Sequence, residues 1–416
     1  MRAKGKEKGR NRMFHIIEGG VCAAKGFQAG AVRCGIKETS EKDDTAVIVS
    51  ENPCAAAAVY TRNRVKAAPL QVTREHLEDG KAQAVIINSG NANACAPDGL
   101  ENARREAAAC GRLLGIDEKD VVVCSTGVIG VRLPVEVIEE NLPALTLSGD
   151  GNEAAAKAIM TTDTVPKIMA VEFMAGGVPC RLGGICKGSG MIHPNMGTML
   201  CILTTDCAVS DAVLQETLRK KVAVSFNRVS VDGDTSTNDT CCILANGQAG
   251  NPEITAAEGE DYENFAAALE TVCVELAKKI AADGEGAGRL VTCTVSGAAD
   301  ENAAETLAKS VCSSSLVKAA MFGADANWGR ILCAMGYSGI EFDPEGVDVD
   351  FASQAGQIAV CRDGRAVEFD EDQAKEILSQ PEVTILISLK EGESAVTAWG
   401  CDLTYEYVRI NGDYRT

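Results

Sequence analysis

Residues 187–206 read KGSGMIHPNMGTMLCILTTD, a glycine-rich polar loop that runs into the apolar stretch TMLCIL. A short apolar run of this kind predicts a buried strand. The runs AVIIN at 84–88 and VVVC at 121–124 have the same character, and each is followed by a loop of small residues. Because such runs alternate with helix-like segments along nearly the whole chain, the sequence predicts an α/β (α+β) fold.

Helical periodicity marks the segments that we expect to cover these strands. Residues 100–115 are alanine-rich and end at a glycine, which is a common helix stop signal. Residues 211–227 and 261–283 carry apolar residues at helical spacing with charged outer faces. All three segments therefore predict helices that lie against a sheet.

The last quarter of the chain has strand signals of its own. Residues 357–370 predict a hairpin that turns at Asp363-Gly364, and residues 382–389 predict a strong strand. These signals indicate a smaller C-terminal α/β unit at about 300–416. Since no Pro/Ser-rich linker or repeat separates it from the rest, we expect the two units to pack closely.

Composition restricts the class of protein. The chain has 416 residues, 46% of them hydrophobic, and no apolar run long enough to span a membrane. Its net charge is −19, so nucleic acid is a poor candidate partner. Residues 1–13 hold six basic residues and one acid without an apolar core, which predicts a disordered basic extension with Met13 as an alternative start. We expect a cytoplasmic protein that needs neither membrane nor nucleic acid.

Cysteine and histidine counts restrict the chemistry. The 18 cysteines form no CxxC pair and occupy positions where alanine or valine would fit, so we interpret them as buried free thiols of a reducing cytosol. The three histidines, His15, His76 and His193, lack the spacing of a zinc site. We expect no metal. With so few histidines, we expect any acyl-transfer reaction to use a base other than histidine.

Three loops could carry chemistry. At Thr126-Gly127 a strand opens into a turn whose N–H groups could stabilise an oxyanion, although an ordinary β–α connection would look the same. Residues 184–190 place Lys187 between glycines without the spacing of a nucleotide-binding loop, which leaves an anion-binding lysine. Residues 283–288 place Glu285 between glycines, where it either meets a cation or amine or lies exposed beyond a helix cap.

The motifs together resemble the ornithine acetyltransferases, the glutamate N-acetyltransferase family of cyclic arginine biosynthesis. The resemblance runs from about residue 14 to the end and rests on ten segments in the family's order, which include 187–206 quoted above, GGVCAAKGFQAGAVRCGIK (19–37), INSGNANAC (87–95), STGVIG (125–130), MTTDTVPK (160–167), SVDGDTSTNDT (230–240), DGEGAG (283–288), GADANWGRI (323–331) and YVRINGDYRT (407–416). The family's fold implies a layered α-β-β-α sandwich with the smaller C-terminal unit attached.

The resemblance also implies a nucleophile. Members of the family cleave themselves before a threonine, which here places the cut between Gly197 and Thr198 and yields an α subunit (14–197) and a β subunit (198–416) that assemble as α₂β₂. Thr198 is then both the new N-terminus and the nucleophile. Its freed α-amine, with a usual pKa of about 7.7–8.0, can serve as the base, so no histidine is required.

By the same resemblance, an acetyl group passes from N2-acetyl-L-ornithine to Thr198 and on to L-glutamate in a ping-pong reaction. Thr126 and Gly127 match the oxyanion hole, and the family's substrate-binding positions correspond to Thr161, Thr162, Lys187, Thr198, Glu285, Asn411 and Thr416. No cofactor is implied, although acetyl-CoA is a possible second donor. The role of His193 stays open.

Two other functions remain open at this point. An amidohydrolase or aminopeptidase with the same N-terminal nucleophile would pass the acyl group to water in place of glutamate. A non-catalytic ligand-binding protein, with Lys187 in an anion loop, would keep an intact chain.

Overall fold

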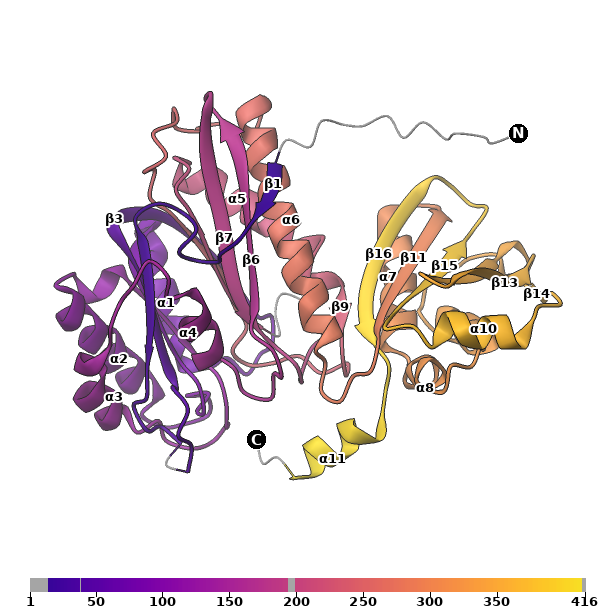
Figure 1. Ribbon diagram of the computed structural model, residues 1–416, viewed down its shortest axis with the longest axis horizontal. Coiled ribbons are helices and arrows are strands. Elements are labelled where there is room, and N and C mark those ends of the chain that lie inside the picture. The colour runs from indigo at the N-terminus through magenta and orange to yellow at the C-terminus, as the bar shows by residue number, and fades with distance from the viewer. Residues whose placement is uncertain (1–13, 38, 194–198, 414–416) are drawn as a thin grey trace.

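The computed structural model describes residues 14–37, 39–193 and 199–413 and contains two sheets (Figure 1). Along the larger sheet the strands follow the order β1 (Phe14–Ile17), β6 (Lys167–Ala175), β7 (Val178–Lys187), β8 (Leu200–Thr205), β10 (Thr240–Ala245), β3 (Thr45–Tyr60), β4 (Lys81–Asn88) and β5 (Val121–Ser125), with β2 (Phe27–Val32) paired to β3. The run TMLCIL quoted above therefore leads into a central strand, β8.

The larger sheet folds back on itself through β3, which is 16 residues long. Its register with β4 shifts between Val49 and Cys54, so its first half pairs with β2 and β4 and its second half with β10. One apolar cluster joins Val85 of β4 to Ile185 of β7 and Ile202 of β8. The sheet thus forms two β layers with a core between them.

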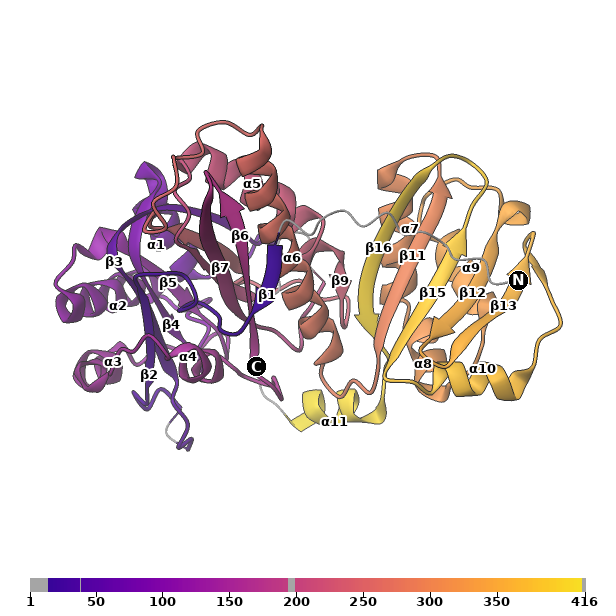
Figure 2. The same ribbon diagram turned by 45° about the horizontal axis from the view of Figure 1, so that its top comes forward.

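Helices cover the outer faces of both β layers. The layer around β4 and β5 is covered by α1 (Ala68–His76), α2 (Gly99–Leu114) and α3 (Val135–Asn141). The layer of β6, β7, β8 and β10 is covered by α5 (Asp211–Ala223) and α6 (Glu260–Ala282), while α4 (Asn152–Ala158) packs on β2 and β3 (Figures 1 and 2). The predicted α-β-β-α sandwich is confirmed.

The smaller unit is built on the second sheet. Its strand order is β14 (Arg365–Ala366), β13 (Gly356–Arg362), β12 (Asp348–Ser353), β15 (Glu382–Ser388), β11 (Leu290–Ala298), β16 (Ser394–Cys401) and β9 (Val229–Ser230). Its core is shared by α7 (Glu301–Ser313), α8 (Ser315–Gly323), α9 (Trp328–Gly336) and α10 (Glu371–Leu378). The unit therefore includes β11, from Leu290, and the two residues of β9.

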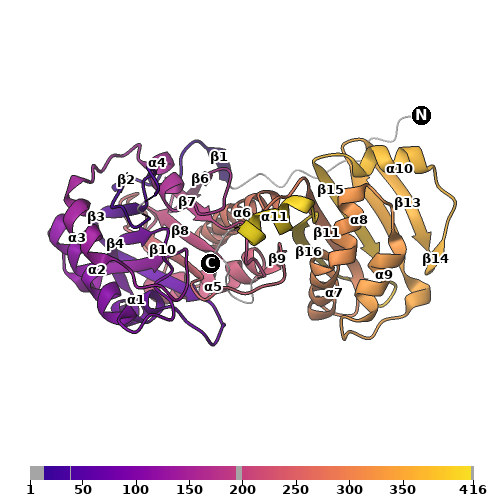
Figure 3. The ribbon, with the colours of Figure 1, turned by 90° about the horizontal axis from the view of Figure 1, so that it is seen from below.

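The two units are joined by packing and by the segment that follows β16, residues 402–413, which we call the strap. Trp399 and Cys401 of β16 belong to the same apolar cluster as α6, which confirms the expectation of close packing. After β16, α11 (Tyr405–Asp413) runs back beneath the sandwich (Figure 3). This return path brings the C-terminal segment to the ends of the central strands.

Most expected elements are present. The helices predicted at 100–115 and 261–283 and the strand predicted at 382–389 correspond to α2, α6 and β15. The helix predicted at 211–227 ends at Ala223, because a short 3₁₀ turn at Phe226–Arg228 leads into β9. In the hairpin the second strand, β14, has only two residues.

The structure buries all but three of the 18 cysteines, as the composition predicted. Burial raises the pKa of the Cys186 thiol to about 12, which leaves it a small apolar side chain at neutral pH. Within the described ranges, no helix is both long enough and apolar enough to cross a membrane.

Candidate active site

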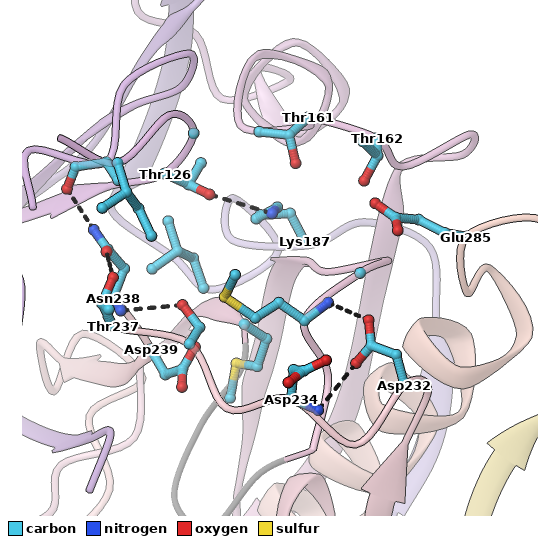
Figure 4. A pocket seen from close by; sticks show the side chains of 18 of the residues that line it. Thr126, Thr161, Thr162, Lys187, Asp232, Asp234, Thr237, Asn238, Asp239 and Glu285 are labelled. Atoms are coloured by element: carbon cyan, nitrogen blue, oxygen red, sulfur yellow. Dashed lines mark hydrogen bonds between the residues drawn. The ribbon is translucent and has the colours of Figure 1, made fainter. Parts of the chain in front are cut away.

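A cavity of about 250 Å³ opens where β5, β7, β8 and β10 meet the strap (Figure 4). Its lining includes every predicted site residue that falls within the described ranges, namely Thr126, Gly127, Thr161, Thr162, Lys187, Glu285 and Asn411. Gly197, Thr198 and Thr416 lie outside the described residues. Met199 and Leu200, which follow Thr198 in the chain, line the cavity as well.

Residues 125–130, which we call the oxyanion loop after the role predicted for them, follow β5 and take a conformation that only glycine suits at one position. Gly127 has a φ of +134°, and a Cβ there would lie 2.3 Å from the carbonyl carbon of Gly90. The Thr126 N–H donates to Asn88 O at 3.0 Å, so it is already engaged. Within the described part of the chain the Gly127 N–H has no acceptor, which leaves it and the Thr126 hydroxyl as donors for a ligand.

Asparagine side chains hold this loop in place. Asn88 Nδ2 donates to Asn91 O at 2.9 Å. Asn238 Nδ2 donates to Ala92 O at 2.6 Å and to Ser125 O at 2.8 Å. These side chains are buried, so their amides replace the water that backbone carbonyls would otherwise need. The sequence analysis missed Asn238, although it lies in the segment SVDGDTSTNDT.

Lys187, the last residue of β7, reaches the oxyanion loop. Its Nζ donates to Thr126 Oγ1 at 3.3 Å, and the residue is 8% exposed. Burial lowers the pKa of Lys187, and the carboxylates of Asp163, Asp239 and Glu285 oppose that shift only in part. A ligand carboxylate in the cavity would favour the charged ammonium.

A buried group that we call the Lys167 brace lies behind Lys187 and consists of Lys167, Asp163 and Asp283. Lys167 Nζ donates to Asp163 Oδ1 at 2.7 Å and to Asp283 Oδ2 at 2.6 Å, and the Lys167 side chain is 0% exposed. Burial raises the pKa of Asp163, but Lys187 and Lys167 outweigh it and the pKa falls to about 2. The brace ties the loop of Thr161 to the end of α6, and sequence analysis did not identify it.

Glu285 forms the opposite wall together with α11. Its Oε2 accepts from Asn411 Nδ2 at 2.7 Å, and its backbone N–H donates to Ser189 O at 3.0 Å. A Cβ on Gly190 would lie 2.3 Å from Glu285 Cδ, so glycine at 190 leaves room for the carboxylate. Glu285 is therefore buried inside the cavity, where an ammonium group could reach it.

Asp232 fixes the chain just before the segment that contains Gly197. It accepts the N–H groups of Met191 at 2.6 Å and Ile192 at 2.8 Å. His193 follows Ile192 in the chain, and its Nδ1 lies 3.0 Å from Ser230 Oγ. Burial lowers the pKa of His193. The sequence analysis missed Asp232.

Asp239 closes the floor of the cavity beside Met199 and was also missed. It is 2% exposed, and its Oδ2 has no hydrogen-bond partner among the residues that the structure describes. Burial raises the pKa of Asp239 well above its usual value.

The cavity can therefore hold a small amino acid derivative by both of its charges. Lys187 offers a cation on one side, and Glu285 offers an anion on the other (Figure 4). Thr126 and Gly127 of the oxyanion loop line the same cavity. Among the described residues no group of His, Cys, Asp or Glu is arranged to hold a metal ion.

Comparison with known proteins gives consistent matches. The ArgJ family matches residues 28–416. The arginine biosynthesis bifunctional protein ArgJ of Caldanaerobacter subterraneus subsp. tengcongensis is 48% identical, over 97% of this chain and 100% of that protein. The protein of the same name from Symbiobacterium thermophilum is 50% identical, over 96% of this chain and 99% of that protein.

Two solved structures are also similar. The arginine biosynthesis bifunctional protein ArgJ of Bacillus halodurans has a TM-score of 0.48 and 43% identity, covering 51% of this chain and 97% of that one. The ornithine acetyltransferase of Mycobacterium tuberculosis, solved with ornithine, has a TM-score of 0.41 and 38% identity, covering 44% of this chain and 99% of that one.

Proposed function

The chain belongs to the ArgJ family and is an acyltransferase of arginine biosynthesis, and from this premise we propose how its site works. An acetyl group moves from N2-acetyl-L-ornithine to Thr198 and then to L-glutamate. One observation carries the proposal: seven predicted site residues from distant segments meet in one cavity at the start of β8. Thr198 precedes that strand by two residues.

Thr198 is the proposed nucleophile. Once it is an N-terminus, its amine with a usual pKa of about 7.7–8.0 can take the hydroxyl proton as the oxygen attacks the acetyl carbonyl. The Gly127 N–H and the Thr126 hydroxyl then stabilise the oxyanion. Ornithine leaves, the acetyl ester remains on Thr198, and the amine of glutamate attacks that ester in the second half of the reaction.

Charge sets the proposed orientation of the substrates. Both acetylornithine and glutamate carry an α-carboxylate, for which the Lys187 ammonium is the matching group. Only ornithine carries a side-chain ammonium, and Glu285 is the anion that fits it. Thr161, Thr162 and Asn411 offer hydroxyl and amide donors within the same cavity, and Thr416 is proposed to complete the site from the C-terminus.

Self-cleavage between Gly197 and Thr198 is proposed to precede catalysis. The two products, 14–197 and 198–416, would share one sheet, because β8 pairs with β7 of the upstream part from Leu182↔Thr205 to Lys187↔Leu200. Separating the two parts would expose the core on both sides of β8, so they should stay together. We propose that two such pairs assemble as α₂β₂.

The reaction as written needs no cofactor or metal. Acetyl-CoA is proposed as a second acetyl donor, in keeping with the term bifunctional in the names of the relatives. Because both substrates are small cytosolic amino acid derivatives, the cytoplasm is the proposed location.

Omitting the acceptor tests the proposal. The purified protein is given N2-acetyl-L-ornithine with or without glutamate, and ornithine release is measured. We expect release to depend on glutamate and to be lost in Thr198→Ala, which should also stay uncut. Release at the same rate without glutamate would favour the amidohydrolase alternative, and acetyl-CoA in place of acetylornithine tests the second donor.

A further inference from the structure

The segment DGEGAG, residues 283–288, contributes Glu285 to the cavity, but that role does not explain its three glycines. One glycine is usually enough to end a helix, so the others need another reason. We call Gly284, Gly286 and Gly288 the glycine seat, because each of them fits against the end of β16 or against the strap. The inference drawn from this fit rests on the proposed function, since it concerns the ornithine ammonium that Glu285 is proposed to bind.

The outer two glycines of the seat meet the beginning of the strap. A Cβ on Gly284 would lie 2.8 Å from the sulfur of Cys401, the last residue of β16. A Cβ on Gly288 would lie 3.0 Å from Asp402 Oδ2, and the Gly288 N–H donates to Asp402 Oδ1 at 2.7 Å. The strap therefore leaves β16 in direct contact with the loop that carries Glu285.

Gly286 meets the first turn of α11. A Cβ there would lie 2.7 Å from both Glu406 Cβ and the Tyr407 nitrogen, which is well inside the distance at which such atoms pack. The Gly286 carbonyl accepts from Thr404 Oγ1 at 2.6 Å, and this bond holds the strap to the loop. Gly286 therefore sets how closely α11 approaches Glu285, its neighbour in the chain.

Tyr407 holds α11 from the side of the cavity. Its hydroxyl donates to Asp232 Oδ2 at 3.4 Å, and its carbonyl accepts from Asn411 Nδ2 at 3.1 Å. The same Asn411 nitrogen donates to Glu285 Oε2 at 2.7 Å. Because Asn411 moves with the helix, a shift of α11 would take this donor away from the Glu285 carboxylate.

The position of α11 depends on these contacts. The helix has nine residues and buries none of them, and so short a helix has little stability in water without packing. Figure 2 shows it just below the end of α6, the helix from which the glycine seat continues. The ring of Tyr405 adds a contact with Phe322 at the start of α11. Beyond that first residue, the glycine seat and Asp232 decide where the helix lies.

We propose that Gly286 and Tyr407 are positioning residues for the recognition of ornithine. They fix α11 at the place where Asn411 holds the Glu285 carboxylate in the cavity, and the carboxylate is then set to meet the side-chain ammonium of the donor. Loss of either residue should therefore weaken the use of donors that carry this ammonium more than the use of donors that lack it.

A pair of acetyl donors tests this role. N2-acetyl-L-ornithine and N2-acetyl-L-norvaline share the carbon chain, the acetyl group and the carboxylate, but norvaline lacks the ammonium. The kcat/KM of each donor is measured with glutamate as the acceptor, from the release of the free amino acid. The ratio of the two values reports the ammonium interaction, because a general loss of structure lowers both values alike.

Gly286→Ala displaces α11 and leaves every other side chain unchanged. We expect the ratio to fall roughly 10-fold or more, which corresponds to the loss of one hydrogen bond to a charged group. Gly115→Ala is the matched control: Gly115 caps α2 with the same φ of +69°, but a Cβ there meets no described atom within 4 Å. This control should keep the wild-type ratio, and equal ratios in the two variants would overturn the inference.

Tyr407→Phe is a milder change, which keeps the inference testable even if Gly286→Ala does not fold. It removes the hydroxyl and keeps the ring. Because the bond to Asp232 is long, we expect the ratio to fall only roughly 2- to 10-fold. Tyr405→Phe makes the same change on a residue that is 83% exposed and should keep the wild-type ratio. A wild-type ratio in Tyr407→Phe would overturn the role of Tyr407.

The wild type separates failure of this inference from failure of the proposed function. If it uses both donors equally well, Glu285 does not bind the ammonium, and the proposed function is wrong on that point. If it prefers acetylornithine and Gly286→Ala keeps the same preference, the proposed function stands and only the positioning role is wrong.

Discussion

The two walls of the cavity are built by different means. The oxyanion loop is fixed from inside: Gly127 fits against the backbone of Gly90, and Asn238 bonds to the strand end from beneath. The opposite wall depends on α11, a helix with no buried residue, whose Asn411 reaches Glu285 through one side-chain hydrogen bond. We therefore expect the chemistry at the oxyanion loop, which we call the rigid wall. We expect recognition of ornithine at the side of Glu285 and α11, which we call the removable wall because few contacts hold it in place.

The Lys167 brace joins the two walls, so breaking it gives the largest expected effect. Lys167→Met removes the ammonium that contacts both Asp163 and Asp283, so Asp283 loses its paired cation and Asp163 keeps only the more distant Lys187. Such changes cost about 3–5 kcal/mol, and urea unfolding should show a loss of that size. Lys157→Met removes an exposed lysine paired with Glu153 at 2.7 Å and should cost under about 0.5 kcal/mol. Similar losses in both variants would mean that the brace does not join the walls.

Gly127→Ala tests the rigidity of the oxyanion wall. Because the new Cβ would collide with Gly90, the loop has to move, and the Gly127 N–H moves with it. Loss of one oxyanion donor lowers kcat by roughly 10²- to 10³-fold. Steady-state assays of ornithine release should show this drop with little change in KM.

The matched control for Gly127 is Gly130→Ala in the same loop. Gly130 also has a positive φ, of +79°, but a Cβ there meets no atom within 4 Å. The change should cost some stability through backbone strain and leave kcat within a few-fold of the wild type. If both variants lose activity equally, backbone conformation matters and the contact with Gly90 does not.

Sequence patterns identified the rigid wall better than the residues that hold it. Apolar runs predicted β5, which ends at Ser125, and β8, which begins at Leu200, because a buried strand has a simple signature. Lys167 opens the apolar run of β6 as its only basic residue, and that contrast was the one available signal for the brace. Asp163 and Asp283 lie 120 residues apart along the chain, so no local pattern joins them.

The other wall was harder to predict in structural terms. The two residues of β9 are too short for any periodicity, yet they complete the second sheet. Asn411 was expected in the site only through the family resemblance, because α11 buries no residue that would mark the face on which it docks. In the sequence, Asp232 and Asp239 look like ordinary loop acids. They become distinctive only in the fold, where Asp239 is buried and Asp232 accepts a backbone N–H group.

Glu285→Gln tests the removable wall. The substitution keeps the size of the side chain and its bond to Asn411 but removes the charge that we propose binds the ornithine ammonium. A hydrogen bond to a charged group contributes about 1.5–3 kcal/mol, so KM for acetylornithine should rise roughly 10- to 150-fold. Transfer of acetyl from acetyl-CoA to glutamate, a reaction in which ornithine takes no part, should change far less. An equal loss for both donors would show that Glu285 acts on the chemistry and does not select ornithine.

Glu106 gives the smallest expected effect and concerns the interior behind the rigid wall. It lies fully buried on α2, and neither carboxyl oxygen has a hydrogen-bond partner among the described residues. Burial raises its pKa well above the value of about 4.3 that it has in the unfolded chain. Its stabilising contribution is therefore complete at pH below about 4.3 and is lost as the pH rises toward the folded pKa.

Stability of the wild type should therefore fall by up to about 1.4 kcal/mol for each pH unit over that window. Glu106→Gln has no proton to lose, so urea unfolding at a series of pH values above about 4.3 should show the stability of the variant rising relative to that of the wild type as the pH rises. Glu101→Gln, an exposed change on the same helix, should follow the wild type. Parallel stability curves for Glu106→Gln and the wild type would mean that water reaches this carboxyl group, and the interior behind the oxyanion loop would then be less rigid than its packing indicates.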